Sequence, residues 1–357
     1  MKKHFSKATP ISVILNLILI INVIIVVYPV LFTISSSLTK SNSLAATSVI
    51  PFTEQTDKST VEMCEACDGK GYRNIDIKSS YKENGKTKTY IGKKLVDCNV
   101  CHGEGEVAVL HTSFKIKKPS LYQFRRLLTG SEQIVKGETT VHGTNYKNWY
   151  LNTLKIAIMN TILTVFICTT TGYIFSRFSF TGRKQIMAGM IVLQMFPSFI
   201  GMVATYVILW KFNALNTLWG LVLVYASGSI PFNAQLMKGY FDTMPRDIAE
   251  AAYIDGASPL VAYLRVILPA AKPQIVFLTL TSFTGPWMDY IFPRMVLRSD
   301  DKKTLAVGLY EMISGRSNDN FTMFAAGAIL VAVPFTIFFM AGQRTLLMSL
   351  AGTSGKE

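Results

Sequence analysis

The sequence predicts an all-α polytopic membrane protein with six transmembrane helices and a small β-rich insertion outside the membrane. Half of the 357 residues are apolar and only 16% are charged, whereas soluble domains carry about a quarter charged residues. Charged residues are absent from six long windows, and a helix needs about 20 apolar residues to cross a bilayer. The net charge of +14 lies largely near the window ends, which indicates membrane topology and argues against nucleic acid as a partner.

The six windows predict the membrane helices in order, with a buried helix of a soluble core as the alternative for each. The first contains an apolar run, Ile11–Ser35, that is too long for a signal peptide, so we expect an uncleaved anchor. The fifth crosses the membrane only if Asp289 lies near the far interface or faces protein or water. The charged residues that bound the windows are Lys7–Lys40, Lys155–Arg177, Lys184–Lys211, Lys211–Lys238, Lys272–Asp289 and Asp319–Arg344.

The distribution of Lys and Arg predicts the orientation of a multi-pass cell-membrane protein. With both termini in the cytoplasm, the short inner loops carry more Lys and Arg than the short outer loops, as the positive-inside rule requires. The predicted organisation is a cytoplasmic tail and first helix over 1–35, an extracytoplasmic loop over 36–150, a five-helix core over 151–346 and a cytoplasmic tail over 347–357.

The longest cytoplasmic segment, residues 242–273, is predicted to form two short helices with a break between them. Glu250 is favourable near a helix N-terminus, Gly256 ends that helix because it tolerates a positive φ, and Ser258 caps the second helix. The first helix has a small apolar face that would let a partner's backbone approach closely, although composition alone also fits an ordinary interfacial helix. That face comprises Ile248, Ala251, Ala252 and Ile254.

The residues of this segment closely resemble the EAA motif of ABC importer permeases. The family pattern is EAA, three residues, Gly, nine residues and I-x-L-P, and only Val266 departs from it. The resemblance implies the type I importer permease fold and a segment that inserts into a cleft on a separate ATPase, whose closure rocks the membrane helices. It assigns the ATPase contact to Glu250, Ala251, Ala252, Asp255, Gly256, Leu268 and Pro269.

Catalysis and nucleotide binding are not expected of this chain alone. The sequence contains no G-x-x-x-x-G-K-[ST] phosphate loop. ATP hydrolysis is therefore expected on another chain, and this chain is expected to be a transporter subunit and not an enzyme.

Two later stretches, Ser282–Tyr290 and Thr304–Leu309, resemble the second, MalG-like permease of carbohydrate importers of the maltose and maltodextrin type. The resemblance implies oligosaccharide as cargo, in membrane lipid, together with a MalF-like second permease subunit, a homodimeric cytoplasmic ATPase and an extracytoplasmic solute-binding protein. It implies that Asp300, Gly308 and Gly315 belong to a loop that enters the binding protein, with a solvated connector as the alternative. Because a carboxylate near the membrane is costly, Asp289 is expected to pair with a partner helix in the permease dimer, with a place in the substrate path as the alternative. Trp287 is an aromatic candidate for sugar contact. Further aromatic candidates for sugar contact are Trp210, Trp219 and Tyr225.

Other functions remain open at the level of the sequence. Importers of other solutes share the cytoplasmic motif, so the cargo rests only on the later resemblance. A zinc-containing membrane enzyme or redox protein is a weaker alternative, because four cysteine ligands would leave no metal position for water.

Two C-x-x-C-x-G-x-G repeats stand in the extracytoplasmic loop, at Cys64–Gly71 and Cys98–Gly105. Each C-x-x-C turn aims two sulfurs at one point, and two turns supply the four thiolates that Zn²⁺ prefers. The predicted ligands are Cys64, Cys67, Cys98 and Cys101. Between the repeats, alternating residues indicate a β-hairpin around Asn84-Gly85. Disulfides are the alternative, because thiols oxidise outside the cytoplasm.

The repeats resemble the cysteine-rich module of DnaJ-type chaperones. That family has four repeats and this chain has two, so the resemblance implies one structural zinc site, in an insertion of about 60–110 with a zinc-ribbon-like character. No J-domain is visible, and chaperone activity is therefore not expected.

Overall fold

The computed structural model describes residues 10–41, 50–64, 70, 72–83, 86–98, 100–102, 106–116, 118–135, 138–142, 144–314 and 320–353. Two of the predicted site residues, Cys67 and Gly315, lie outside these ranges. The chain divides into two compact units, which are described separately. The smaller unit is Ala45–Lys118, and the larger one combines Met1–Leu44 with Pro119–Glu357.

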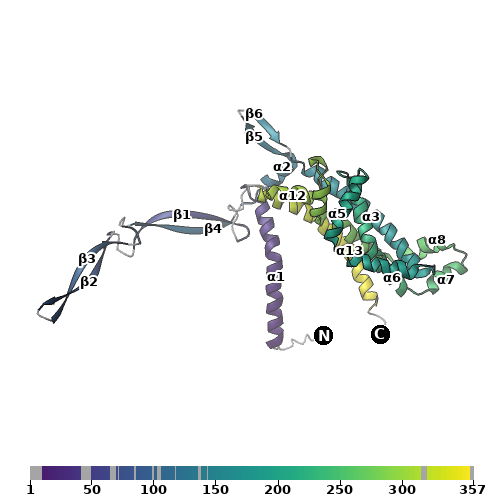
Figure 1. Ribbon diagram of the computed structural model, residues 1–357, viewed down its shortest axis with the longest axis horizontal. Helices are drawn as coiled ribbons and strands as arrows, with labels where there is room; N and C mark the ends of the chain where they lie inside the picture. Colours follow the sequence, from purple (N-terminus) through teal and green to yellow (C-terminus); the bar gives the residue numbers. More distant parts are fainter. Residues whose placement is uncertain are drawn as a thin grey trace, which may run out of the picture. The chain divides into compact units, whose positions relative to one another are not determined.

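The larger unit is built almost entirely from helices (Figure 1). Its four longest helices are α1 (Pro10–Ser37), α3 (Tyr146–Arg177), α6 (Leu218–Thr243) and α13 (Phe321–Thr353). The shorter ones are α2 (Tyr122–Thr129), α4 (Arg183–Met195), α5 (Ser198–Lys211), α7 (Asp247–Ile254), α8 (Pro259–Ala262), α9 (Leu268–Ala270), α10 (Lys272–Met288), α11 (Ile291–Val296) and α12 (Leu305–Ile313). A π-helical turn covers Tyr263–Ile267, a 3₁₀ turn covers Asp300–Lys302, and β5 (Ser131–Val135) pairs antiparallel with β6 (Glu138–His142).

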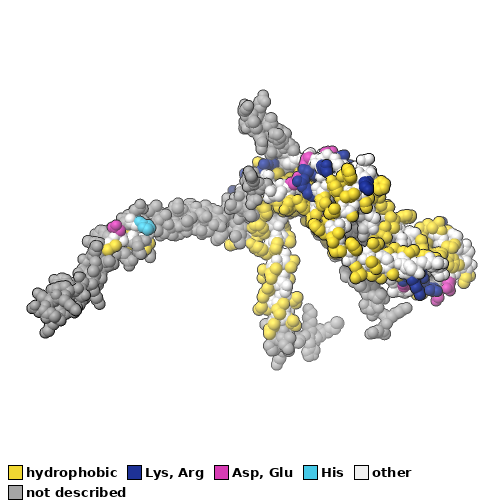
Figure 2. Space-filling view, viewed as in Figure 1, with side chains coloured by type: hydrophobic (Ala, Val, Ile, Leu, Met, Phe, Trp, Pro, Cys, Tyr) yellow, Lys and Arg dark blue, Asp and Glu magenta, His cyan; other side chains and the backbone are white. Residues whose placement is uncertain are grey.

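Membrane-spanning character is clear for three helices of the described residues, at 14–37, 146–177 and 321–343. Figure 2 shows hydrophobic side chains along α1, and those from Ile14 to Leu31 are largely exposed. Two bent helix pairs raise the number of candidate spans to five if each pair is counted as one. The helix in the fourth window, α6, is not among them, and six spans therefore stay a prediction.

The third predicted window is not one straight helix. It forms α4 and α5, which meet at 106°. The break falls at Pro197, which has an extended backbone (φ −60°, ψ 118°) and no N–H to continue a helical ladder. A second bend, of 78°, separates Pro259–Ala270 from α10. Each bent pair is either a broken span or a segment that re-enters the same side.

Helix α3 is the central element of the larger unit, because it packs against α6, α10, α12 and α2. It approaches α6 closely at Gly172. A Cβ at that position would lie 2.6 Å from the Cβ of Met237 and 2.9 Å from the backbone nitrogen of Lys238. The absence of a side chain at Gly172 therefore sets the distance between the two helices, as small residues do in membrane helix pairs.

The smaller unit contains two antiparallel hairpins, and the second lies between the two strands of the first in the sequence. The outer hairpin pairs β1 (Thr53–Met63) with β4 (Glu106–Ile116), and the inner one pairs β2 (Tyr72–Glu83) with β3 (Lys86–Asp97). Because Glu83 pairs with Lys86, the inner strands are joined by two residues, which confirms the predicted hairpin around Asn84-Gly85. The two ladders form separate sheets in the part of the chain that the structure describes.

We expect Gly172→Ala to lower the melting temperature of the full-length chain in detergent, because the new methyl group meets Met237 and the α6 backbone. Overpacking of this kind costs about 1–3 kcal/mol. Gly228→Ala is the matched control, since no atom lies within 4 Å of its Cβ position and it gains only helix propensity. Thermal unfolding followed by size-exclusion chromatography gives the comparison. Equal melting temperatures for the two variants would contradict the close approach.

Candidate functional site

The first candidate site is the segment between α6 and α10, which we call the coupling segment (residues 244–271). Its helices α7 and α8 lie together at one end of the larger unit, and α12 lies toward the other end (Figure 1). Asp247 and Glu250 are in the first turn of α7, where a carboxylate is favourable. Gly256 follows α7 with φ 83°. The Ser258 hydroxyl accepts the Val261 N–H at 3.4 Å and caps α8. The predicted pair of short helices with a glycine break is confirmed.

The residues predicted to contact an ATPase do not all lie on the surface. Glu250, Ala251, Asp255, Gly256 and Pro269 are exposed, and Leu268 is half-buried. Ala252 is buried, so its predicted place on the exposed face is wrong. It packs inward together with Ala249, three residues earlier, because residues three apart share one face of a helix.

The outward side of the coupling segment forms an exposed apolar face. Ile254 is 87% exposed and Leu260 is 65% exposed. Exposed apolar side chains gathered on one short segment are typical of a protein interface. Ile248 and Leu264 of the same segment are also exposed.

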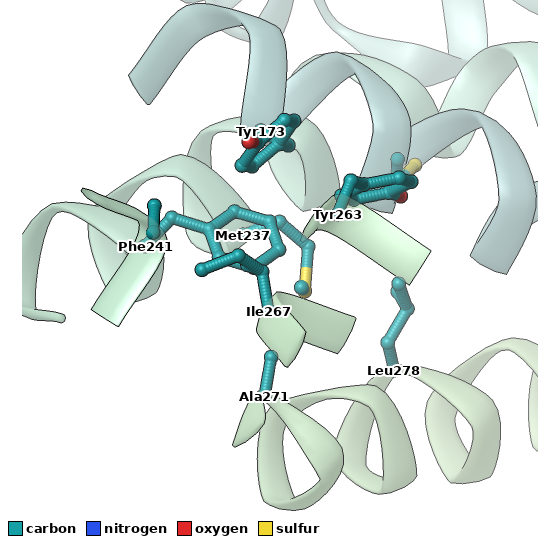
Figure 3. Close-up of a cluster of buried hydrophobic side chains, with 9 residues drawn as sticks. Tyr173, Met237, Phe241, Tyr263, Ile267, Ala271 and Leu278 are labelled. Atoms are coloured by element: carbon teal, nitrogen blue, oxygen red, sulfur yellow. The ribbon is translucent and has the colours of Figure 1, made fainter. Parts of the chain in front are cut away.

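The inward side of the coupling segment is held by a buried cluster that also includes α3 and α6 (Figure 3). The ring of Tyr263 lies with its centroid 4.6 Å from that of Tyr173 on α3, and the Tyr173 ring meets Phe241 of α6 at 5.8 Å. Ile267 and Ala271 are fully buried in the same cluster. Since packed interiors transmit displacement, a force on the coupling segment reaches both helices.

Polar contacts reinforce this attachment where α6 ends. Arg177 donates through Nη2 to the backbone oxygens of Phe241 at 3.0 Å and Met244 at 2.9 Å. The Phe241 oxygen also accepts the Met244 N–H at 3.2 Å, whereas the Met244 oxygen lies past the helix end and takes its hydrogen bond from Arg177. The Tyr263 hydroxyl donates to Thr169 Oγ1 on α3 at 3.2 Å. The end of α6 and the coupling segment are therefore both tied to the last turns of α3.

The second candidate site, which we call the polar pocket, is a cavity of about 360 Å³ between α3, α6 and α10. Its lining combines amides, hydroxyls and aromatic rings, and none of these groups carries a charge at neutral pH. The lining residues are Asn160, Tyr225, Ser229, Phe232, Asn233, Phe277, Thr281, Ser282, Gly285 and Pro286.

Hydrogen bonds orient part of this lining. Asn160 donates from Nδ2 to the Ser282 backbone oxygen at 2.8 Å and accepts from Thr164 at 3.3 Å. The Ser282 side-chain hydroxyl is buried and has no hydrogen-bond partner among the described residues. A buried hydroxyl without a partner is costly. The pocket therefore offers fixed polar groups to a neutral ligand that has hydroxyls of its own.

Of the residues predicted for the substrate path, Trp287 and Asp289 lie beside the polar pocket and do not line it. Trp287 is buried and packs edge-on against Tyr150 at 5.2 Å and Phe335 at 5.1 Å. Asp289 accepts from the Tyr225 hydroxyl at 2.9 Å. Of the alternatives left open for this carboxylate, contact with protein is the one observed. Sequence reasoning named Tyr225 and missed the other polar lining residues, whose signal is an isolated amide or hydroxyl in an apolar window.

Asp300 and Gly308 belong to a stretch that is fixed to the start of α3. The Asp300 backbone oxygen accepts from Trp149 Nε1 at 2.9 Å, and Gly308 lies directly against the Trp149 ring. Desolvation acts against ionisation of Asp300, but hydrogen bonds from Lys303 and Asn145 hold the pKa of its carboxyl below the usual range. Gly308 is buried, so a partner can reach Asp300 but not Gly308.

Three cysteines of the smaller unit form a cluster. The sulfurs of Cys64 and Cys98 lie 3.9 Å apart, and those of Cys64, Cys98 and Cys101 all lie within 4.8 Å of one another. All three side chains are buried. The structure thus brings together the three predicted metal ligands that it describes. Cys168 of α3, by contrast, packs in the buried apolar cluster beneath the coupling segment, with no other cysteine among the described residues of that cluster.

The comparisons with known proteins agree with the geometry. Residues 168–346 match the family model of the binding-protein-dependent transport system inner membrane component. The chain is 42% identical to the maltodextrin transport system permease protein MdxG of Bacillus subtilis over 214 residues, which are 59% of this chain and 77% of that protein. It is 34% identical to the galactooligosaccharides transport system permease protein GanQ of the same organism, over 70% of this chain and 85% of that protein.

A solved structure shares the fold. It is a bacterial ABC transporter involved in the import of the acidic polysaccharide alginate, with a TM-score of 0.64 over 96% of this chain and 99% of that chain. The sequence identity is 17%, so this similarity concerns the fold alone.

We expect Arg177→Met to lower the melting temperature in detergent, because it leaves the Met244 carbonyl without its donor and removes one of the two donors to the Phe241 carbonyl. Loss of such partners costs about 1–3 kcal/mol. Arg183→Met is the matched control, since Arg183 makes one exposed bond at 3.3 Å to Phe178 O. If Arg177→Met melts at the temperature of the control, the two bonds do not hold the end of α6.

Proposed function

The chain belongs to the family of binding-protein-dependent transport system inner membrane components, and we propose that it carries an oligosaccharide of the maltodextrin type. It is the permease subunit of a sugar ABC importer and not an enzyme. Members of this family work with a second permease, an ATPase and a solute-binding protein. In the proposed assembly these partners are a MalF-like permease, a homodimeric cytoplasmic ATPase and an extracytoplasmic sugar-binding protein.

The coupling segment is proposed to dock on the ATPase. One observation supports this most strongly: its outward side is an apolar face around Ile254, while its inward side is buried against α3 and α6. The exposed Glu250 and Asp255 provide charged contacts at the rim of the face. Closure of the ATPase dimer would then displace the segment, and the buried cluster would carry that displacement into the membrane helices.

The polar pocket is proposed to line the sugar path. Amide and hydroxyl groups beside Phe232 and Phe277 suit a neutral sugar, which presents hydroxyls on its edge and C–H groups on its face. A charged solute would favour opposite charges in the path, and the lining residues carry none at neutral pH. This feature favours a neutral oligosaccharide over amino acids, phosphate or metal ions as cargo.

The proposed topology follows from the position of the ATPase. A coupling segment in the cytoplasm places both termini there if α1, α3, the α4–α5 pair, α6, α10 and α13 make six crossings. The 36–150 loop and the α12 end of the larger unit are then extracytoplasmic. In this arrangement the exposed Asp300, and not the buried Gly308, would be available to the binding protein.

We expect Gly256→Ala to uncouple sugar uptake from ATP hydrolysis. A non-glycine residue at φ 83° costs about 1–2 kcal/mol, enough to depopulate the docking geometry by about fivefold or more, while no atom lies within 4 Å of the added methyl. Gly182→Ala is the matched control, because Gly182 has φ 90° and equally open space outside the coupling segment. Maltodextrin uptake and ATPase rates of the reconstituted complex provide the readout. Equal uptake per ATP in both variants would overturn the proposed role.

We expect Thr281→Ala to slow maltodextrin uptake at saturating binding protein by about fivefold, the equivalent of one hydrogen bond of about 1 kcal/mol. Thr279→Ala is the matched control. Both hydroxyls donate to a backbone oxygen four residues earlier on α10, at 3.1 Å and 2.8 Å, but only Thr281 lines the polar pocket. Equal slowing by the two variants would place the sugar path elsewhere.

A further inference from the structure

We infer that the smaller unit holds one structural Zn²⁺ ion at the cluster of Cys64, Cys98 and Cys101. The proposed transport function of the larger unit does not require a metal site in the smaller unit. The fourth ligand expected from the C-x-x-C spacing is Cys67, which lies outside the described residues.

The separation of the sulfurs fits a tetrahedral metal centre. Zinc–sulfur bonds of about 2.3 Å in a tetrahedron place neighbouring sulfurs about 3.8 Å apart. Cys64 Sγ and Cys98 Sγ lie 3.9 Å apart, and Cys101 Sγ is within 4.8 Å of both. The three sulfurs therefore outline one face of a ZnS₄ tetrahedron. A disulfide joins two sulfurs at about 2.05 Å, whereas Cys64, Cys98 and Cys101 form no disulfide with one another in the structure.

The ends of two strands lie at this point. The strand β1 ends at Met63, directly before Cys64, and β3 ends at Asp97, directly before Cys98. His102, immediately after Cys101, has φ 51°, a left-handed conformation that turns the chain sharply after the second C-x-x-C turn. Both connections between the outer and the inner hairpin therefore pass the sulfur cluster.

The ion would give the smaller unit a buried core. Each ladder has only two strands, and isolated two-stranded hairpins are marginally stable in water. Among the side chains of the smaller unit whose exposure the structure describes, only the three cysteines are buried. The binding free energy of a structural zinc ion acts as folding free energy in small domains of this kind. With Cys67 as the fourth ligand the metal would have no open site, and its role would be structural and not catalytic.

The first test measures metal content in the full-length chain, purified in detergent through a tag that does not bind metal. We expect about one zinc per chain by plasma mass spectrometry, and at least tenfold less in Cys98→Ser. Cys168→Ser is the matched control, because it removes the buried thiol of α3 and leaves the cluster intact. Zinc retained by Cys98→Ser, or iron at one per chain in the unaltered protein, overturns the inference.

A second test uses the unaltered chain and so does not depend on a variant that folds. Removing the ion with a chelator should expose residues 45–118 to a protease, and added zinc should restore protection. In denaturant with chelator and without reductant, all four cysteines of the unit should be alkylated. Cysteines that react only after reduction are disulfides, and a cleavage pattern that is indifferent to zinc shows that no ion joins the hairpins. Either result overturns the inference.

Discussion

The packing of Tyr263 and Ile267 against α3 and α6 is the constraint on which the rest of the larger unit depends. It requires α3 and α6 to lie close together, which Gly172 permits, and it requires α6 to end beside α3, which Arg177 secures. The coupling segment then has only its outer side free. The apolar side chains near Ile254 are thus exposed while the inner side of the segment is buried. In the proposed mechanism the exposed side receives force from the ATPase, and the buried side transmits it to α3 and α6.

Local signals made the coupling segment predictable. The glycine break depends on the conformation of one residue, and the cap depends on Ser258 and the backbone three residues later, so both can be predicted from the sequence. The burial of Ala252 could not be predicted. Ala251 and Ala252 are chemically identical, and only the packing of the helix against the core determines which of the two is buried. The break at Pro197 had a local signal, but a count of charge-free residues does not register it.

The polar pocket was harder to predict, because it is assembled from single residues on three helices. Asn160, Ser229 and Thr281 stand in different apolar windows, and no spacing within one window connects them. Aromatic residues drew attention instead, and of these only Tyr225 lines the pocket. The cysteine cluster shows the opposite case. Each short motif fixes the local placement of its cysteines, so the motif could be recognised from the sequence. The described cysteines of the two repeats lie together although the two strands between the repeats contain more than twenty residues.

The place of α10 has a consequence for the energetics of transport. This helix begins directly after Ala271 of the buried cluster, and successive residues serve both sites: Leu278 packs in the cluster, whereas Phe277 faces the polar pocket. If the polar pocket takes sugar and the coupling segment takes the ATPase, as proposed, these two binding equilibria share α10. Thermodynamic reciprocity then holds between them: if seating the ATPase weakens the affinity for sugar by some factor, sugar weakens the seating of the ATPase by the same factor.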